Sequence, residues 1–395
     1  MPWKECSTVD ERLKFVARRI EGERMSDLCA EFGISRKTGH KIWKRYKDFG
    51  IEALENRTRR PYRYANQIPL LLEKYVIKAK KDRPSWGAPK IRELILRKYP
   101  TIKPPAKSTI HAVLARNGLV KHQSRRKNKA MGTHLSWSKN PNDIWCADYK
   151  GEFMLGDRRY CYPLTITDHQ SRYLIACEGL DTTKETYAFK VFNRIFSEFG
   201  LPRTIRTDNG VPFACPNSLF NLSKLSVWWL RLGIEIERIK PGHPEQNGRH
   251  ERMHRTLKQD ATKPAAPNML LQQERFDDFR EDFNRNRPHE ALNMKCPAEV
   301  YTPSNRPYEM LRELEYPNHD KIIRVTSCGR ICFDNKKISL SNVFAGQEVG
   351  IKETDDGIWL VTFMNYDLGY FDEEGLRFEP LKNPFGSKVL PMSPV

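Results

Sequence analysis

Three acidic residues in this sequence of 395 residues stand where carboxylates could hold metal ions. Asp148 lies inside an apolar and aromatic run, Asp208 directly follows a β-branched segment, and Glu251 is one turn into a charged helical stretch. A carboxylate within an apolar strand is costly unless it is paired, and metal ligation is a common solution. Oxygen ligands without a matching set of histidines and cysteines predict Mg²⁺, for which Mn²⁺ can substitute. Together the three acids predict two-metal phosphoryl transfer.

Alternative interpretations exist for these residues and their neighbours. Each aspartate taken singly could be a helix cap or a turn former. Glu245 is a rival third ligand, although it precedes the Asn-Gly pair that starts the helix. Asp168, late in the second predicted strand, is expected to be structural. His243 and His250 are expected to be loop and surface histidines rather than ligands.

A predicted helix over residues 249–260 positions the third acid, because this stretch contains neither Pro nor Gly and follows turn-forming residues. Residues three, four and seven apart share a helix face, so Glu251, Arg255 and Lys258 project together. Two apolar residues of the same helix can face a core: Met253 and Leu257. The charged face suits a polyanionic partner; the alternative is a solvated face with an ordinary ion pair.

The composition agrees with a polyanionic partner. Lysine and arginine outnumber aspartate and glutamate by 19, and the sequence pI is near 9.5. Residues of hydrophobic type make up 39% of the chain, which is enough for packed cores. No apolar run approaches the roughly 18 residues of a membrane span, so we expect no membrane partner and a cytoplasmic location. The nine cysteines contain no C-x-x-C pair and predict reduced thiols rather than zinc or disulfides.

The region before the acids is helical and basic. Residues 1–54 have the spacing of a helix-turn-helix DNA-binding domain, with Ser26 and Ser35 as predicted caps of its second and third helices. The third helix would turn a basic face to DNA, through Arg36, Lys37, His40, Lys41 and Lys44. The alternative is a basic bundle without specific binding. Residues 55–67 read as a basic linker, in which three residues are predicted to contact DNA: Arg57, Arg59 and Arg60.

A second helix-turn-helix domain is predicted over residues 68–120. Residues 121–142 follow as a basic linker, which predicts tracking of a phosphate backbone or, equally, a solvated hinge. Three residues of this linker are predicted to contact DNA: Arg125, Arg126 and Lys127.

The rest of the chain changes from helix to strand. Residues 143–305 show a run of strands followed by alternating helices and strands, which predicts a mixed sheet covered by helices. Residues 306–380 contain short strands between glycine turns and predict a small β-barrel. The predicted fold class is therefore multidomain α and α/β, and residues 381–395 are expected to form a flexible tail.

The acidic segments resemble those of a known family. The motif residues are Asp148 in its aromatic strand, the segment 207–210 reading Thr-Asp-Asn-Gly, and the segment 244–251 that ends on Glu251. They resemble the D, D and E segments of the retroviral-integrase-like DDE transposases. The segment 284–292 resembles the end of this core in the IS3 and IS481 insertion-sequence families, and two preceding helix-turn-helix units are similar to IS481 organisation.

The resemblance implies an RNase H-like core in which Asp148, Asp208 and Glu251 hold two Mg²⁺ ions, one on each side of Asp148. Water would first free a 3′-OH at the end of the element, and that hydroxyl would then attack target DNA. Asn247, Arg255 and Lys258 match family positions that contact terminal DNA. The implied protein is a nucleoid-associated bacterial transposase that binds terminal inverted repeats of double-stranded DNA as a homo-oligomer.

One departure and two rival functions accompany this resemblance. Glu251 follows Asp208 by 43 positions (251 − 208), which is longer than the family pattern. We assign the surplus to a surface insertion around residues 215–226. The rivals are a catalytically inactive regulator that only binds DNA, and an RNase H-type nuclease that only hydrolyses.

Overall fold

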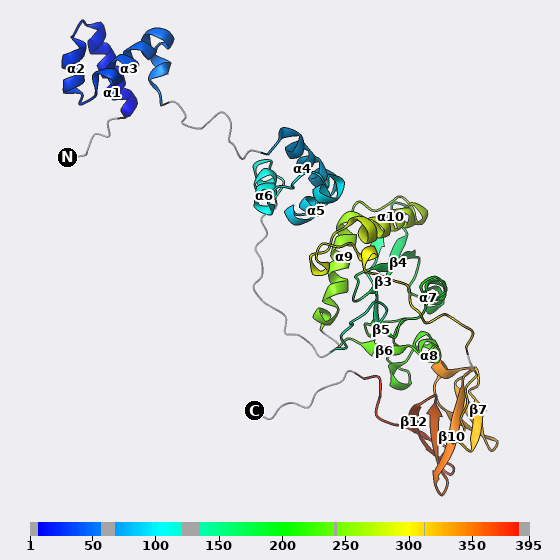
Figure 1. The fold of residues 1–395 in the computed structure, drawn as a ribbon. Helices are drawn as coiled ribbons and strands as arrows, with labels where there is room; N and C mark the ends of the chain where they lie inside the picture. The colour runs from blue at the N-terminus through cyan, green and yellow to red at the C-terminus, as the bar shows by residue number, and fades with distance from the viewer. Residues whose placement is uncertain (1–6, 57–67, 121–134, 241–242, 312, 387–395) are drawn as a thin grey trace, which may run out of the picture. The chain divides into compact units, whose positions relative to one another are not determined.

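The computed structural model describes residues 7–56, 68–120, 135–240, 243–311 and 313–386. The chain divides into two compact units, Met1–Pro69 and Leu70–Val395, whose elements are drawn in Figure 1. Six residues predicted to contact DNA lie outside the described residues: Arg57, Arg59, Arg60, Arg125, Arg126 and Lys127. In the described part of the chain, no helix is long and apolar enough to cross a membrane.

The first unit is a small helical domain. Its elements are α1 (Thr8–Ile20), α2 (Met25–Glu31), α3 (Arg36–Phe49) and η1 (Ile51–Leu54). The Ser35 hydroxyl accepts a hydrogen bond of 3.2 Å from the Thr38 amide, which confirms the predicted cap of α3. Ser26 does not cap α2, because this helix begins one residue earlier at Met25. A side chain at Gly39 would meet the Cys29 sulfur at 2.4 Å, so glycine is what lets α3 pack closely on α2.

The second unit begins with three more helices, α4 (Leu70–Asp82), α5 (Ala88–Lys98) and α6 (Lys107–Arg116). They share a small apolar core in which Ile91 and Ile110 are fully buried. Two ion pairs connect these helices to the domain that follows, because Arg83 lies 2.6 Å from Asp282 and Arg97 lies 2.6 Å from Glu299.

The central domain is built on the predicted mixed sheet. Its strands are β1 (Ile144–Tyr149), β2 (Phe153–Met154), β3 (Tyr160–Asp168), β4 (Leu174–Leu180), β5 (Thr204–Thr207) and β6 (Glu235–Arg238). The order is β2-β3-β1-β5-β6, with β4 also paired to β3. β1 is antiparallel to β3 and parallel to β5, and β5 is parallel to β6.

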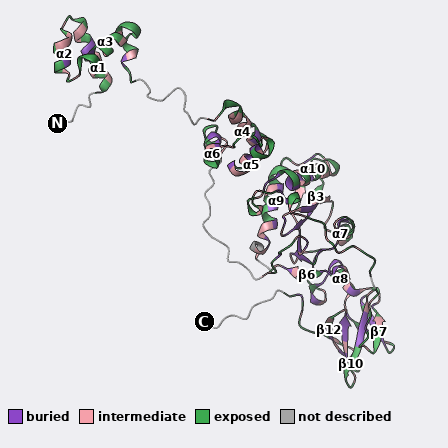
Figure 2. Ribbon diagram, in the orientation of Figure 1, coloured by how far each residue is buried: buried purple, intermediate pink, exposed green. Residues whose placement is uncertain are grey.

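Helices cover both faces of this sheet. They are α7 (Glu185–Phe199), α8 (Lys224–Arg231), α9 (Gly248–Asp260) and α10 (Met269–Glu281). Successive side chains of β1 point to opposite faces. Trp145 and Ala147 therefore pack in one core with α7 and α8, whereas Cys146 and Asp148 face the side where α9 lies. Figure 1 shows these helices around the sheet. Figure 2 shows the buried residues gathered along the sheet between these helices.

The C-terminal region also consists of strands, as predicted. They are β7 (Lys321–Arg324), β8 (Arg330–Phe333), β9 (Lys336–Ser339), β10 (Glu348–Asp355), β11 (Ile358–Phe363), β12 (Tyr366–Asp372) and β13 (Phe378–Pro380). The predicted barrel is wrong for the described residues, because the strands form an open sheet of order β13-β12-β11-β10-β7 and a separate β8-β9 pair. The two edge strands of the larger sheet do not pair with one another, so the sheet does not close.

The segment predicted as a surface insertion packs against this C-terminal sheet. Phe220 and Leu222 are 7% and 0% exposed and belong to the same apolar core as the C-terminal strands. Phe385 contacts the Phe220 ring, and the Asn383 side chain donates a hydrogen bond of 3.2 Å to the Phe220 carbonyl oxygen. The insertion is therefore an interface between two domains. Phe385, which belongs to the predicted flexible tail, is buried in the same apolar core.

Candidate active site

The first two acids are brought together by the parallel pairing of β1 and β5. In this pairing Ile144 lies opposite Thr204, and Cys146 lies opposite Arg206. Continuing the register by two residues places Asp148 level with Asp208, which immediately follows β5. A parallel pair therefore delivers both carboxylates to the same edge of the sheet.

The pKa of Asp148 is raised by its burial and by the two neighbouring acids. Burial, then the negative charge of Asp208, then that of Glu251 raise this pKa to about 7. Burial also raises the pKa of Asp208, against a hydrogen bond of 3.1 Å that its carboxylate accepts from the Gly210 amide. Both aspartates therefore lie in surroundings that disfavour their negative charge.

Glu251 reaches this region from the first turn of α9. The glutamate is exposed, as are Arg255 and Lys258, which follow it on the same helix face. Met253 and Leu257 are 4% and 0% exposed and pack in a core with α10, which confirms the predicted division of the helix.

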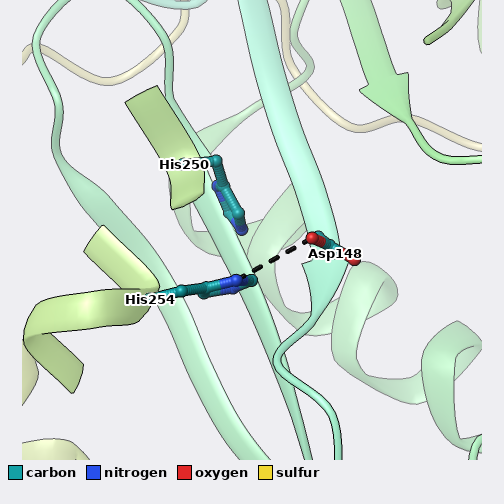
Figure 3. Close-up of side chains that lie close together, drawn as sticks. All are labelled: Asp148, His250 and His254. Atoms are coloured by element: carbon teal, nitrogen blue, oxygen red, sulfur yellow. Dashed lines mark ion pairs between the residues drawn. The ribbon is translucent and has the colours of Figure 1, made fainter. Parts of the chain in front are cut away.

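Two buried histidines on α9 surround Asp148 (Figure 3). His254 Nδ1 lies 3.8 Å from Asp148 Oδ2. The Thr165 hydroxyl lies 2.8 Å from His250 Nε2 and 2.7 Å from His254 Nε2. The prediction that His250 is a surface histidine is wrong, because its side chain is 1% exposed and points into the sheet. His254 was not predicted, although its spacing of four from His250 places both on one helix face.

The hydrogen bonds of Thr165 show which ring nitrogen of His250 and His254 carries the proton. The Thr165 hydroxyl donates to the Asp148 carbonyl oxygen at 3.0 Å, so its oxygen accepts from Nε2–H of both histidines. Burial lowers the pKa of His250 to about 3 and lowers that of His254 further, so both rings are neutral. His254 Nδ1 therefore presents a lone pair to the carboxylate of Asp148.

The donor set fits a divalent cation. Burial, then the negative charges of Asp208 and Glu251, disfavour the ionised form of Asp148, and a neutral imidazole offers a lone pair beside it. Asp148, His250 and His254 each place one ligand atom within 4.8 Å of the others. A bound cation would offset the repulsion of Asp148 by the neighbouring acids. It would also separate two facing acceptors, His254 Nδ1 and Asp148 Oδ2. Mg²⁺ prefers carboxylate oxygens as ligands.

Other predicted residues occupy different settings. The five basic residues of α3 that are predicted to meet DNA are all exposed: Arg36, Lys37, His40, Lys41 and Lys44. Asn247 is 4% exposed and so does not lie on the surface beside Arg255.

Asp168 is structural as predicted, because its buried carboxylate accepts hydrogen bonds from the Asn142 amide and from the amide and hydroxyl of Ser171. The Glu245 side chain lies outside the described set.

Comparisons with known families match the same regions. Residues 138–244 and 232–297 each match an integrase core domain. Residues 138–297 are therefore similar to integrase core domains. Residues 11–62 match a helix-turn-helix domain, and residues 38–114 match a homeodomain-like domain.

Similar proteins come from insertion elements. The IS476 uncharacterized 39.2 kDa protein of Xanthomonas euvesicatoria is 24% identical over 54% of this chain and 60% of its own length. The IS407 uncharacterized 31.7 kDa protein of Burkholderia multivorans is 25% identical over 44% of this chain and 62% of its own length. The chain thus spans about three fifths of these relatives. The predicted likeness to insertion-sequence DDE transposases with an integrase-like core is confirmed.

A solved structure is also similar in part. The HTLV-2 integrase catalytic core domain in complex with magnesium is 16% identical, covers 42% of this chain and 100% of its own, and has a TM-score of 0.34.

Proposed function

We propose that this protein is a DNA transposase that cleaves the 3′ ends of its insertion sequence and joins them to target DNA. The observation that carries the proposal is the parallel pairing of β1 and β5, which places Asp148 level with Asp208 in a segment that matches integrase core domains. Burial, then the charges of Asp208 and Glu251, raise the pKa of Asp148. Such a set of acids needs positive charge to remain ionised near neutral pH.

Different residues would bind the metal ions and the DNA in this reaction. Asp148, Asp208 and Glu251 would hold two divalent ions, with Mg²⁺ as the expected metal and Mn²⁺ as a substitute. Bound Mg²⁺ supplies activation of the attacking hydroxyl and charge stabilisation of the leaving oxygen. His254 would turn its Nδ1 lone pair toward an ion held by Asp148, and Arg255 and Lys258 would bind the phosphate backbone next to it.

The helical domains would deliver the DNA. The exposed basic face of α3 has the form of a recognition helix in the major groove. We propose that it reads the terminal inverted repeats, and that a homo-oligomer on DNA brings two ends together. The basic residues outside the described part, at 57–60 and 125–127, would bind phosphates between these modules.

The test is a strand-transfer reaction on a plasmid that carries the DNA flanking the encoding gene. Wild type with Mg²⁺ should give joined products, and Asp208→Asn should lower their yield by at least about a thousandfold, the scale of losing an essential catalytic group. Asp181→Asn is the matched control, because Asp181 also directly follows a core strand, is exposed, and is not part of the acidic set.

The rival functions give different products. If wild type and Asp208→Asn bind DNA equally and the wild type gives no product, the inactive regulator is supported. Nicked DNA without joined products would support the nuclease that only hydrolyses. Products of equal yield from wild type and Asp208→Asn would contradict the assignment of the metal site.

A further inference from the structure

A second charged region lies beside α9, in a half-open cavity of about 280 Å³. None of Asp148, Asp208 and Glu251 lines it. Its walls come from the sheet, from α9, from α5 and from the connection after α10. We propose that this cavity is a binding site for a phosphate group, and this inference is independent of the proposed function.

The walls carry more cations than acids. Five cationic side chains line the cavity: Lys90, Arg172, Arg249, Arg252 and Arg287. Two acidic residues line it: Asp168 and Glu290. The formal balance is therefore +3 (5 − 2). Asp168 already accepts three hydrogen bonds from neutral donors, and Glu290 is exposed.

Within the described residues, four of the five cations have no carboxylate partner: no ion pair joins Lys90, Arg172, Arg249 or Arg252 to an acid, whereas Arg287 pairs with Asp260. The buried Nε of Arg172 also has no hydrogen-bond partner. Unpaired buried donors of this kind cost free energy unless a ligand accepts from them.

The mutual repulsion of these cations is visible in their pKa values. Burial, then the positive charges of Arg249 and Arg252, lower the pKa of Arg172 to about 10. Burial, then the charge of Arg287, lower that of Lys90 to about 8. Bound anionic oxygens would reverse both effects.

The remaining side chains are held in place as a binding site requires. Arg249 donates to the His169 carbonyl oxygen at 3.0 Å and stacks on the exposed Trp137 ring at 4.9 Å. Arg287 is 7% exposed and is fixed by Asp260 and the Ser85 hydroxyl. His289 Nε2 is buried without a partner. Arginine forks and a neutral imidazole together match the oxygens of a phosphate.

The phosphate could be a free anion or part of a DNA backbone, since both offer the same oxygens. In either case, it would bind side chains from α5, α9 and the strand region at once. The second helical domain and the integrase core would then share one ligand, and its binding would stabilise their contact.

Equilibrium dialysis of the full chain with radiolabelled inorganic pyrophosphate tests the site, in EDTA and at fixed ionic strength. We expect saturable binding of one pyrophosphate per wild-type chain. Arg172→Gln should weaken it at least about tenfold, the scale of one charge-assisted hydrogen bond. Arg158→Gln is the matched control, because Arg158 is an exposed arginine in the turn between β2 and β3.

A second readout separates a ligand-binding role from a structural one. In phosphate-free buffer, Arg172→Gln should leave the melting temperature unchanged or raise it, because it removes a repelled charge. If this variant does not fold, Arg252→Gln, at an exposed position on α9, replaces it in the dialysis. Either variant binding pyrophosphate as the wild type does, or no saturable binding by the wild type, overturns the proposal.

Adding saturating duplex DNA distinguishes the two sources of phosphate. Displacement of pyrophosphate from the wild type, with weaker DNA binding by Arg172→Gln, assigns the cavity to a backbone phosphate. Retention of pyrophosphate beside bound DNA assigns it to a free anion.

Discussion

Helix α9 separates two charged regions of opposite sign. Glu251 extends from it toward Asp148 and Asp208, whereas Arg249 and Arg252 line the basic cavity. The helical period places residues 251, 255 and 258 on one face and residues 249, 252 and 256 on another. An ion network built for stability would pair these acids with these cations. Their separation instead leaves each region short of opposite charge, as expected of two binding sites.

The two regions differ in how they hold their uncompensated charge. Around Asp148, hydroxyl and imidazole groups form an internal hydrogen-bond network with the strand carrying Thr165. In the basic region, the buried Nε of Arg172 has no hydrogen-bond partner among the described residues, and the side chain lines a cavity. The acidic region is therefore preorganised for small ions, and the basic one for a larger polyatomic anion.

Substitution of His254 should have the largest effect of these tests, and it should change the function of the acidic region without changing that of the basic cavity. His254→Ala removes the imidazole beside Asp148, so strand transfer should fall about 10- to 100-fold, the scale of losing a group that supports a metal site. The Mg²⁺ concentration for half-maximal rate should also rise. Binding of pyrophosphate should not change, because His254 does not line the basic cavity.

His254→Gln is the conservative control for this prediction. Its amide can still donate to the Thr165 hydroxyl, so it should recover part of the lost activity. An unchanged Mg²⁺ dependence in His254→Ala would show that the imidazole only fills space.

Asp148→Asn tests the cost of charge in the acidic region. The pKa of Asp148 is about 7 in the fold and near its ordinary value of 3.8 in the unfolded chain. The fold therefore favours the protonated form, and this stabilisation is complete below the unfolded pKa and is lost as pH rises through 7. In EDTA, wild type should melt several degrees lower at about pH 8 than at about pH 5, and Asp148→Asn should show a smaller loss.

Mg²⁺ supplies the internal control for this effect. At the higher pH it should raise the melting temperature of wild type and have little effect on Asp148→Asn. Equal pH dependence of the two proteins would locate the acid-sensitive group elsewhere.

The sequence predicted those parts of the site that depend on local pattern. Asp208 follows a short strand, and Glu251 shares a helix face with Arg255 and Lys258, so local pattern predicts where these side chains lie, whereas the roles of Arg255 and Lys258 are implied only by the resemblance. The parallel register that sets Asp148 level with Asp208 is non-local, and only the resemblance pointed to it.

The errors have a common physical reason. His250 is polar and precedes an exposed glutamate, which favours a surface position; its hydroxyl partners, Thr165 and Thr167, come from another strand. Likewise, short strands separated by turns do not reveal whether a sheet closes. The basic cavity gathers Lys90, Arg172 and Arg252 from distant segments, so no sequence window shows it.

Lys258→Ala should have the smallest effect and tests whether the two sides of α9 act separately. Removing one phosphate contact should weaken binding to duplex DNA a few-fold and lower the slope of log affinity against log salt by about one. The fold should be retained, because alanine is favourable at an exposed helix position. Lys190→Ala, at an exposed position on α7, is the control and should change neither quantity. Pyrophosphate binding should stay at the wild-type level in Lys258→Ala. If it fell as far as in Arg172→Gln, the two faces of α9 would form one continuous anion-binding surface rather than two sites.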